Sequence, residues 1–413
     1  MYLLVIKKPR LPLTCSLRRP ALCGGFRHAT NSKPSWYPSQ VESPLGQQDL
    51  LPLASLHRLE ELDISISNQQ FFQPLLSAQL ASGLTALTYM GLSGCPVSCL
   101  ADVNSCRALV ELNVGCPDGL EEVLSPIEWA AVGDLVSLTE LHLNNAKMLS
   151  PTPEYCAAIA KLTKLQRLGA GMWSKSMLPG LASFTQLTKL EGGWQQDNSV
   201  VDGVVLPGVV ELALTSGSPP FSALPNLVSV EQYDCLSTRA FTGMAQYCSA
   251  LRELKVADSR MGVMTMQVNE PLPARIDAWL ALSTLTGLTC LDCMVADKFE
   301  LVVVVDVVCG LLPNGFQRLS LKAVQPANLL PKHLLLLAKL RGLPELLLQV
   351  DSSTEESTAD AIMTDAVMFL IAVSGIDSLR LKGLTGEQVR KVAVAVRRLK
   401  AIHLPCPKSV AFY

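Results

Sequence analysis

The chain contains few aromatic and few charged residues, and both absences limit what it can be. Phe, Trp and Tyr make up 5% of its 413 residues, and Asp, Glu, Lys and Arg together make up 17%. Hydrophobic residues still reach 49%, which excludes a chain that is disordered over most of its length. The net charge of −2 argues against a globally basic nucleic-acid-binding protein. A Leu-rich core with little aromatic bulk favours thin, repeated packing layers.

Signals of secretion and of membrane insertion are also absent from the sequence. It has no N-x-Ser/Thr acceptor site, and its 13 cysteines are odd in number and irregularly spaced, unlike a disulfide framework. The longest apolar run, Phe299–Leu312, is interrupted by Glu300 and Asp306, whereas a bilayer span needs about 20 apolar residues. We therefore predict an intracellular, cytoplasmic protein without a membrane span.

The first 50 residues differ in composition from the rest. Residues 1–41 hold seven Lys and Arg residues and no Asp or Glu, and the prolines there disfavour long helices or strands. We interpret residues 1–50 as a basic, Pro-rich and mostly disordered leader. Two alternatives stay open, an organellar transit peptide and a tail that docks on an acidic surface.

One phrase recurs from residue 51 onward: an apolar residue, two variable residues, a second apolar residue, two more variable residues, and then apolar-x-apolar. Fourteen copies follow one another with a mean spacing of about 26 residues. The third apolar residues of the copies are Leu62, Met90, Leu112, Leu141, Leu168, Leu190, Leu212, Val230, Leu254, Leu291, Leu319, Leu346, Leu379 and Ile402.

This pattern predicts a stack of similar units. Apolar-x-apolar is typical of a short strand with one face in the core, and because no unit can bury that face alone, neighbours must stack. Several segments between the strands have helical periodicity. These are 155–161, 239–248, 277–285, 328–340, 359–373 and 387–399. We expect an α/β solenoid curved like a horseshoe, with parallel strands on the concave face and helices and irregular returns on the convex face.

The phrase resembles that of the leucine-rich repeat family, L-x-x-L-x-L-x-x-N/C-x-L. Cys95 and Cys235 stand at the Asn/Cys position, which in the family satisfies backbone groups in the turn after the strand. Spacings of about 27–28 residues with helical returns are most similar to the intracellular ribonuclease-inhibitor-like or cysteine-containing type. The resemblance implies one repeat domain over residues 51–413 that binds a protein partner on its concave face.

Two stretches depart from the regular spacing. Residues 257–284, with three methionines and two prolines, predict an irregular insertion. The copies from Leu168 to Val230 are so closely spaced that we expect short 3₁₀ or extended returns there instead of full helices.

Motifs for catalysis, metals or cofactors are weak in this sequence. Cys290-x-x-Cys293 lacks a second ligand pair for zinc. Gly169-x-Gly171 lacks the third glycine of a dinucleotide fingerprint. Residues far apart in a solenoid's sequence stay apart in space, so a catalytic triad assembled across the chain is not expected. We predict no enzyme activity, no cofactor and no metal.

The side chains beside the buried strand positions are the candidate partner-binding residues. They predict a concave face that is acidic towards the N-terminus and basic towards the C-terminus, with Trp173 and Trp194 as an aromatic anchor in adjacent repeats. The alternative for the two Trp residues is a place in the core. The candidates are Tyr89, His142, Asn144, Arg167, Trp173, Trp194, Glu211, Glu231, Tyr233, Arg318, Lys322, Arg380 and Lys382.

The function that follows is that of a non-catalytic protein-interaction scaffold or adaptor, itself monomeric. The alternatives are a substrate receptor or regulator of a ubiquitin ligase, and a structural component of a cytoskeletal or axonemal assembly. The residues do not select a partner, because partner identity lies in the side-chain detail of the binding face.

Overall fold

The structure is a computed structural model, and the chain divides into two compact units, Met1–Val204 (unit 1) and Val205–Tyr413 (unit 2). No helix in the described part of the chain is long and apolar enough to cross a membrane. The described residues are 2–7, 51–66, 78–95, 97–115, 125–148, 157–158, 160–195, 203–232, 238–256, 272–295, 298–323, 335–340, 342–349, 376–382, 386–401 and 409–412.

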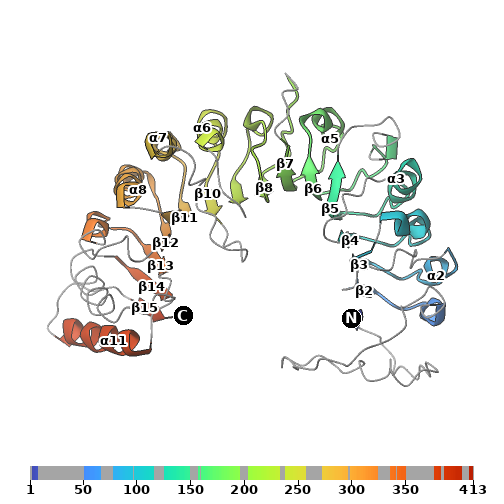
Figure 1. The fold of residues 1–413 in the computed structure, drawn as a ribbon, viewed down its shortest axis with the longest axis horizontal. Helices are drawn as coiled ribbons and strands as arrows, with labels where there is room; N and C mark the ends of the chain where they lie inside the picture. Colours follow the sequence, from blue (N-terminus) through green and yellow to red (C-terminus); the bar gives the residue numbers. More distant parts are fainter. Residues whose placement is uncertain are drawn as a thin grey trace. The chain divides into compact units, whose positions relative to one another are not determined.

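In unit 1 the strands lie side by side in chain order and form a sheet (Figure 1). The first pair, β1 with β2, is antiparallel, and the later pairs from β2 to β7 are parallel. The strands are β1 (Tyr2–Lys7), β2 (Glu61–Ile66), β3 (Tyr89–Ser93), β4 (Glu111–Gly115), β5 (Glu140–Met148), β6 (Arg167–Trp173) and β7 (Lys189–Trp194).

Short helices return the chain between the strands of unit 1. They are α2 (Ala78–Gly83), α3 (Pro126–Gly133), α5 (Leu178–Leu181) and the 3₁₀ helices Leu51–Ser55, Val97–Ser105 and Lys175–Met177. The 3₁₀ turn and the four-residue α5 between β6 and β7 confirm the prediction of short returns in the closely spaced copies. These helices lie behind the sheet, so the opposite side of the strands is the one that faces solvent (Figure 1).

Unit 2 repeats the same arrangement with parallel strands throughout its described part. Its strands are β8 (Glu211–Leu214), β9 (Ser229–Gln232), β10 (Glu253–Val256), β11 (Cys290–Val295), β12 (Arg318–Ala323), β13 (Glu345–Gln349), β14 (Ser378–Lys382) and β15 (Ser409–Phe412). Its helices are α6 (Thr238–Tyr247), α7 (Leu272–Ala281), α8 (Lys298–Leu311) and α11 (Gly386–Ala401), with 3₁₀ helices Phe221–Ala223, Leu282–Thr284, Leu312–Asn314 and Leu335–Lys339.

The strand register confirms thirteen of the fourteen predicted copies. In unit 1 the third apolar residues align strand by strand from Leu62 to Leu190, and in unit 2 from Leu212 to Leu379. Every member of these two columns is at most 2% exposed. The columns are therefore the apolar cores of the two units, built as the repeat phrase predicts.

The fourteenth copy was placed wrongly at Ile402. The strand that pairs with β14 on its far side is β15, whose Val410 aligns with Leu379, and α11 runs up to Ala401. The error has a physical cause: Leu399 and Ile402 are three residues apart, a spacing that fits one face of a helix as well as the repeat phrase. The pattern alone could not separate these two structures.

The helix predictions fared unevenly. Helices α6 and α11 confirm the periodicity of residues 239–248 and 387–399. Of residues 328–340 the described part forms only a 3₁₀ helix, and residues 359–373 lie outside the described residues. Helix α7 and the 3₁₀ helix Leu282–Thr284 confirm the helical periodicity of residues 277–285. Residues 272–281 were also assigned to the irregular insertion, and because they form α7 with a fully buried Trp279, the insertion prediction is wrong for this part.

The leader prediction also needs a correction at its start. Residues 2–7 form β1 and pair with all six residues of β2, so they belong to the sheet instead of to a disordered segment. Residues 8–50 lie outside the described residues, as do residues 257–271.

Two side-chain ladders support the turns before the strands. The carbonyl oxygen of Val110 accepts the backbone N–H of Thr139 at 2.8 Å and also the Thr139 hydroxyl at 3.3 Å. Thr88, Thr188 and Thr289 make the same contact with the preceding repeat. In other copies a buried cysteine contacts the preceding repeat: Cys106 Sγ lies 3.6 Å from Ala81 O, and Cys248 Sγ lies 3.6 Å from Leu224 O.

Candidate functional site

The solvent side of strands β2 to β7, here called the strand face, carries the candidate residues of unit 1. Its side chains flank the buried column, so the strand register places them in two rows. The first row is Glu61, Tyr89, Glu111, Glu140, Arg167 and Lys189, and the second is Asp63, Gly91, Asn113, His142, Gly169 and Glu191.

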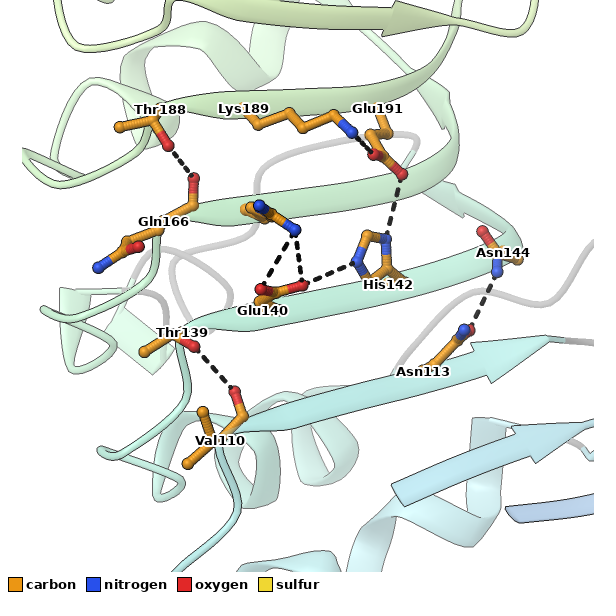
Figure 2. Close-up of polar contacts among 11 residues, drawn as sticks. Val110, Asn113, Thr139, Glu140, His142, Asn144, Gln166, Thr188, Lys189 and Glu191 are labelled. Carbon is orange, nitrogen blue, oxygen red and sulfur yellow. Dashed lines mark hydrogen bonds and ion pairs between the residues drawn. The ribbon is translucent and has the colours of Figure 1, made fainter. Parts of the chain in front are cut away.

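His142 is the centre of an ion-bridged group on β5, β6 and β7 (Figure 2). Its Nδ1 lies 3.3 Å from Oε2 of Glu191, although Glu191 stands two strands away. The strand between them carries Gly169 at that position, and a Cβ there would lie 2.7 Å from the His142 Nδ1. The bridge from β5 to β7 is therefore possible because the intervening strand β6 has a glycine, with no side chain, at this position.

Cations complete this group on both sides. Arg167 Nη1 lies 3.3 Å from Glu140 Oε1, and Lys189 Nζ lies 2.5 Å from Glu191 Oε1. Nε2 of His142 faces Glu140 Oε2 at 4.0 Å (Figure 2). Each carboxylate of the group thus has a positively charged partner, and neighbouring strands hold each other's side chains.

Glu191 is the residue whose ionisation this arrangement changes most. Its pKa falls from 4.5 to about 2, first because of the hydrogen bond with His142 and then because of Lys189, against an opposing effect of burial. The carboxylate stays ionised at any physiological pH.

The acidic part of the strand face lies on β2 to β4. Burial raises the pKa of Glu111, and the negative charge of Glu140 raises it further. The pKa of Tyr89 rises for the same two reasons, with Asp63, Glu111 and Glu61 as the neighbouring charges. The ring of Tyr89 folds over Gly91, where its hydroxyl lies 2.9 Å from the position a Cβ would take. This region therefore combines an aromatic ring with surrounding carboxylates.

Asn144 also lies on the strand face, at the end of the second row. Its Nδ2 donates a hydrogen bond of 3.0 Å to Oδ1 of Asn113 on the neighbouring strand (Figure 2). The candidates Tyr89, His142, Asn144 and Arg167 are thus brought onto one surface of unit 1.

The aromatic-anchor hypothesis for Trp173 and Trp194 is wrong. The two side chains are 0% and 2% exposed, and their ring centroids are 6.4 Å apart in the core. The Trp173 Nε1 donates a 2.8 Å hydrogen bond to the carbonyl of Glu191. Because the returns of these two repeats are short, large side chains fill the space that a full helix occupies in other repeats.

In unit 2 the ion pairs on the strands are more isolated, and one of them includes the candidate Arg380. Arg380 Nε lies 2.9 Å from Glu345 Oε1, and Lys255 Nζ lies 2.7 Å from Glu253 Oε2. Glu211 is exposed on β8 and Glu231 half-buried on β9, and Arg318 is half-buried on β12. Tyr233 and the side chains of Lys322 and Lys382 lie outside the described part, so the basic C-terminal end stays a prediction.

No metal site or redox pair emerges from the described residues. Within them, no group of three or more His, Cys, Asp or Glu side chains is placed to hold a metal ion. Cys290 is half-buried, whereas Cys293 is buried in the core, and neither forms a disulfide. The two thiols of Cys290-x-x-Cys293 thus lie in different environments on β11.

The fold is a leucine-rich-repeat solenoid. Each described repeat contributes one parallel strand and one return, and the Leu columns of both units are buried as the repeat phrase requires. The ribonuclease-inhibitor-like subtype does not follow from these observations.

Comparison with known proteins adds little to this assignment. No family model matches the chain, and neither does any curated protein. Among solved structures, the alignment with the internalin inlF from Listeria monocytogenes covers 86% of this chain and 89% of the internalin chain, at 15% sequence identity and with a TM-score of 0.36. A second internalin, inlC2, matches 53% of this chain and 87% of its own at 17% identity, with a TM-score of 0.28.

Sequence reasoning missed two features of the structure, one on the strand face of unit 1 and one behind the sheet of unit 2. The bridge between His142 and Glu191 was not foreseen, although a glycine at the aligned position of the intervening strand was a readable signal. Helix α8 was missed because its run of valines has little polar alternation, and Leu301, Val304 and Val308 are all buried behind the sheet.

Proposed function

We propose that this chain is a non-catalytic protein-interaction scaffold or adaptor, and that the strand face of unit 1 is its docking surface. The observation that carries the proposal is the ion-bridged group of Glu140, His142, Arg167, Lys189 and Glu191. These long side chains are already held by partners before any complex forms. Docking on them therefore costs less side-chain entropy than docking on free rotamers.

The charge of the surface supports a partner with a basic contact region. Asp63 and Glu111 lie beside Tyr89 on β2 to β4, whereas the cations of the ion-bridged group, Arg167 and Lys189, lie on β6 and β7. A positively charged partner would associate faster with the acidic end, at a rate that falls as salt is added.

The contacts in unit 2 are an extension of the same proposal. Glu211, Glu231, Arg318 and Arg380 occupy solvent-side strand positions. The helices α6, α7, α8 and α11 support the ribonuclease-inhibitor-like type, in which helices line the side opposite the strands. We also propose, from the sequence alone, that the protein is cytoplasmic and monomeric.

The experiment is affinity purification of the tagged full chain with mass spectrometry, at low and at moderate salt. Wild type is compared with Asp63→Lys/Glu111→Lys, which reverses two charges on the strand face. The matched control is Asp134→Lys/Asp306→Lys, which makes the same charge change at two half-exposed positions on the return side, each paired with a lysine.

The expected result is a protein retained by wild type and by the control and lost by the strand-face variant. A partner lost equally in both variants would show that net charge, and not this surface, controls binding. If no specific protein is retained at either salt concentration, the scaffold proposal fails. Ubiquitin-ligase subunits among the retained proteins would favour the receptor alternative.

A further inference from the structure

Strand β1 differs from the other strands in the described part of the chain. It is the one that pairs antiparallel with its neighbour, while the repeat strands pair in parallel. It is not a repeat itself, because the repeat phrase begins at Leu56 and residues 8–50 separate β1 from it. β1 is therefore a strand added to the edge of a sheet that the repeats build.

The pairing covers the whole of β2. The register runs without a shift from Tyr2 opposite Ile66 to Lys7 opposite Glu61, so each of the six residues of β2 has a partner. Residues 8–50 carry no copy of the repeat phrase, and β1 is the strand that pairs with β2 on the side away from β3. Without β1 the outer N–H and C=O groups of β2 would be open to pairing with another chain.

The segment that occupies the edge has a simple chemistry. Residues 2–6 are Tyr, Leu, Leu, Val and Ile, and Lys7 follows opposite Glu61. On the side of β2, Leu62 and Ile64 are buried core residues aligned with Ile6 and Leu4. Strand addition draws affinity from main-chain hydrogen bonds, and alternate side chains supply the selectivity.

We propose that the outer edge of β2 is a strand-acceptor site, which β1 fills within the chain and which takes in trans an extended apolar segment of another protein in the same antiparallel register. The site lies at the edge of the sheet, apart from the strand face, and does not depend on the proposed function. Removal of residues 1–50, as for a transit peptide, would take β1 away and open the acceptor edge to such a segment.

The test uses the full chain with its own strand disabled. In Leu4→Pro/Ile6→Pro, two N–H donors of β1 are lost and the extended pairing is blocked. The matched control, Leu17→Pro/Ala21→Pro, places two prolines between β1 and the repeats. The probe is a fluorescent synthetic peptide of residues 1–8, and its own double-proline version is the negative control.

Two readouts decide the question. In wild type the attached strand competes at an effective concentration on the order of millimolar, so micromolar peptide should not bind, and the same holds for the Leu17→Pro/Ala21→Pro control. The Leu4→Pro/Ile6→Pro variant should bind the peptide saturably. Its β2 amides should lose protection from hydrogen exchange and regain it when the peptide is added.

The proposal is overturned if the folded Leu4→Pro/Ile6→Pro variant does not bind the peptide, or if its β2 amides exchange as slowly as in wild type. Equal binding of the peptide by wild type and variant would overturn it too, since the edge would then not be occupied by β1. Circular dichroism checks the fold, and Leu4→Pro alone replaces the double variant if the latter does not fold.

Discussion

The Trp173→Ala/Trp194→Ala variant is expected to unfold the repeats around β6 and β7. Both rings are buried and lie 6.4 Å apart, so each truncation leaves a cavity beside the other. Replacing a core Trp by Ala costs about 3–5 kcal/mol, and the hydrogen bond from Trp173 to the Glu191 carbonyl contributes about 1 kcal/mol more. Because neighbouring sites do not add independently, we expect about 6–8 kcal/mol for the pair.

That loss is comparable with the whole stability of a domain, which is about 5–15 kcal/mol. The assay is denaturant unfolding followed by circular dichroism, together with hydrogen exchange resolved along the chain. In a repeat protein the stability is nearly a sum of repeat and nearest-neighbour terms. The loss of protection should therefore centre on β5 to β7 and leave α7 and α8 of unit 2 protected.

The control is Arg167→Ala/Lys189→Ala, which alters the same two strands on their solvent side. Each of these side chains makes one partly exposed ion pair, so the control should cost about 1 kcal/mol or less per pair. If the double Trp variant unfolds at the same denaturant concentration as this control, the two rings are not packed in the core. The reasoning from their burial would then be refuted, and the anchor hypothesis would return.

Three further predictions concern Gly192, Glu191 and the two buried thiols of Cys106 and Cys248. Gly192 has φ +139°, and a Cβ there would lie 2.0 Å from the Ala170 carbonyl oxygen. Gly192→Ala should therefore lower the stability measured by thermal unfolding by about 2–3 kcal/mol. An unchanged stability would contradict the close approach of the two backbones. Glu191 has a pKa lowered from 4.5 to about 2 in the fold, so its contribution is present above pH 4.5 and is lost as the pH falls towards 2. At neutral pH the free energy of unfolding measured by denaturant titration should be about 1–2 kcal/mol higher for wild type than for Glu191→Gln, with solvent screening included. The same difference in unfolding free energy at pH 2 would contradict this prediction. Burial raises the pKa of the Cys106 and Cys248 thiols to about 11 and 12. Iodoacetamide should therefore label these thiols far more slowly in the native protein at pH 8 than after unfolding, as measured by mass spectrometry of the labelled peptides. Fast labelling of the native protein would show that the two thiols are not buried.

The repeat architecture could be predicted because it depends on short-range pattern. A strand buries every second residue, so the alternation of Leu141 and Leu143 is enough to predict their strand. Each unit also needs its neighbour to cover the buried face, which predicts the stack. Thirteen register positions followed from this rule. The rule failed at Ile402, where a helix face and the repeat phrase share the same spacing.

The surface could be predicted only in outline. The two rows of the strand face follow from alternation, so Tyr89, His142, Asn144 and Arg167 were correctly placed on one side of the sheet. Which of them touch depends on side chains two strands apart and on the gap at Gly169. Such contacts join residues about 50 positions apart in the chain, and no local pattern encodes them.

By itself, the sequence determined the repeat, its period and the residues that fill the core, because these depend on alternation and on the need of each unit for a neighbour. Only the tertiary structure decided which face Trp173 and Trp194 occupy, how His142 reaches Glu191, and that residues 2–7 close the edge of β2. The reason is physical: burial of a large side chain, a bridge across a glycine and the pairing of an edge strand all depend on what the neighbouring segment leaves open. That space exists only once the repeats have stacked.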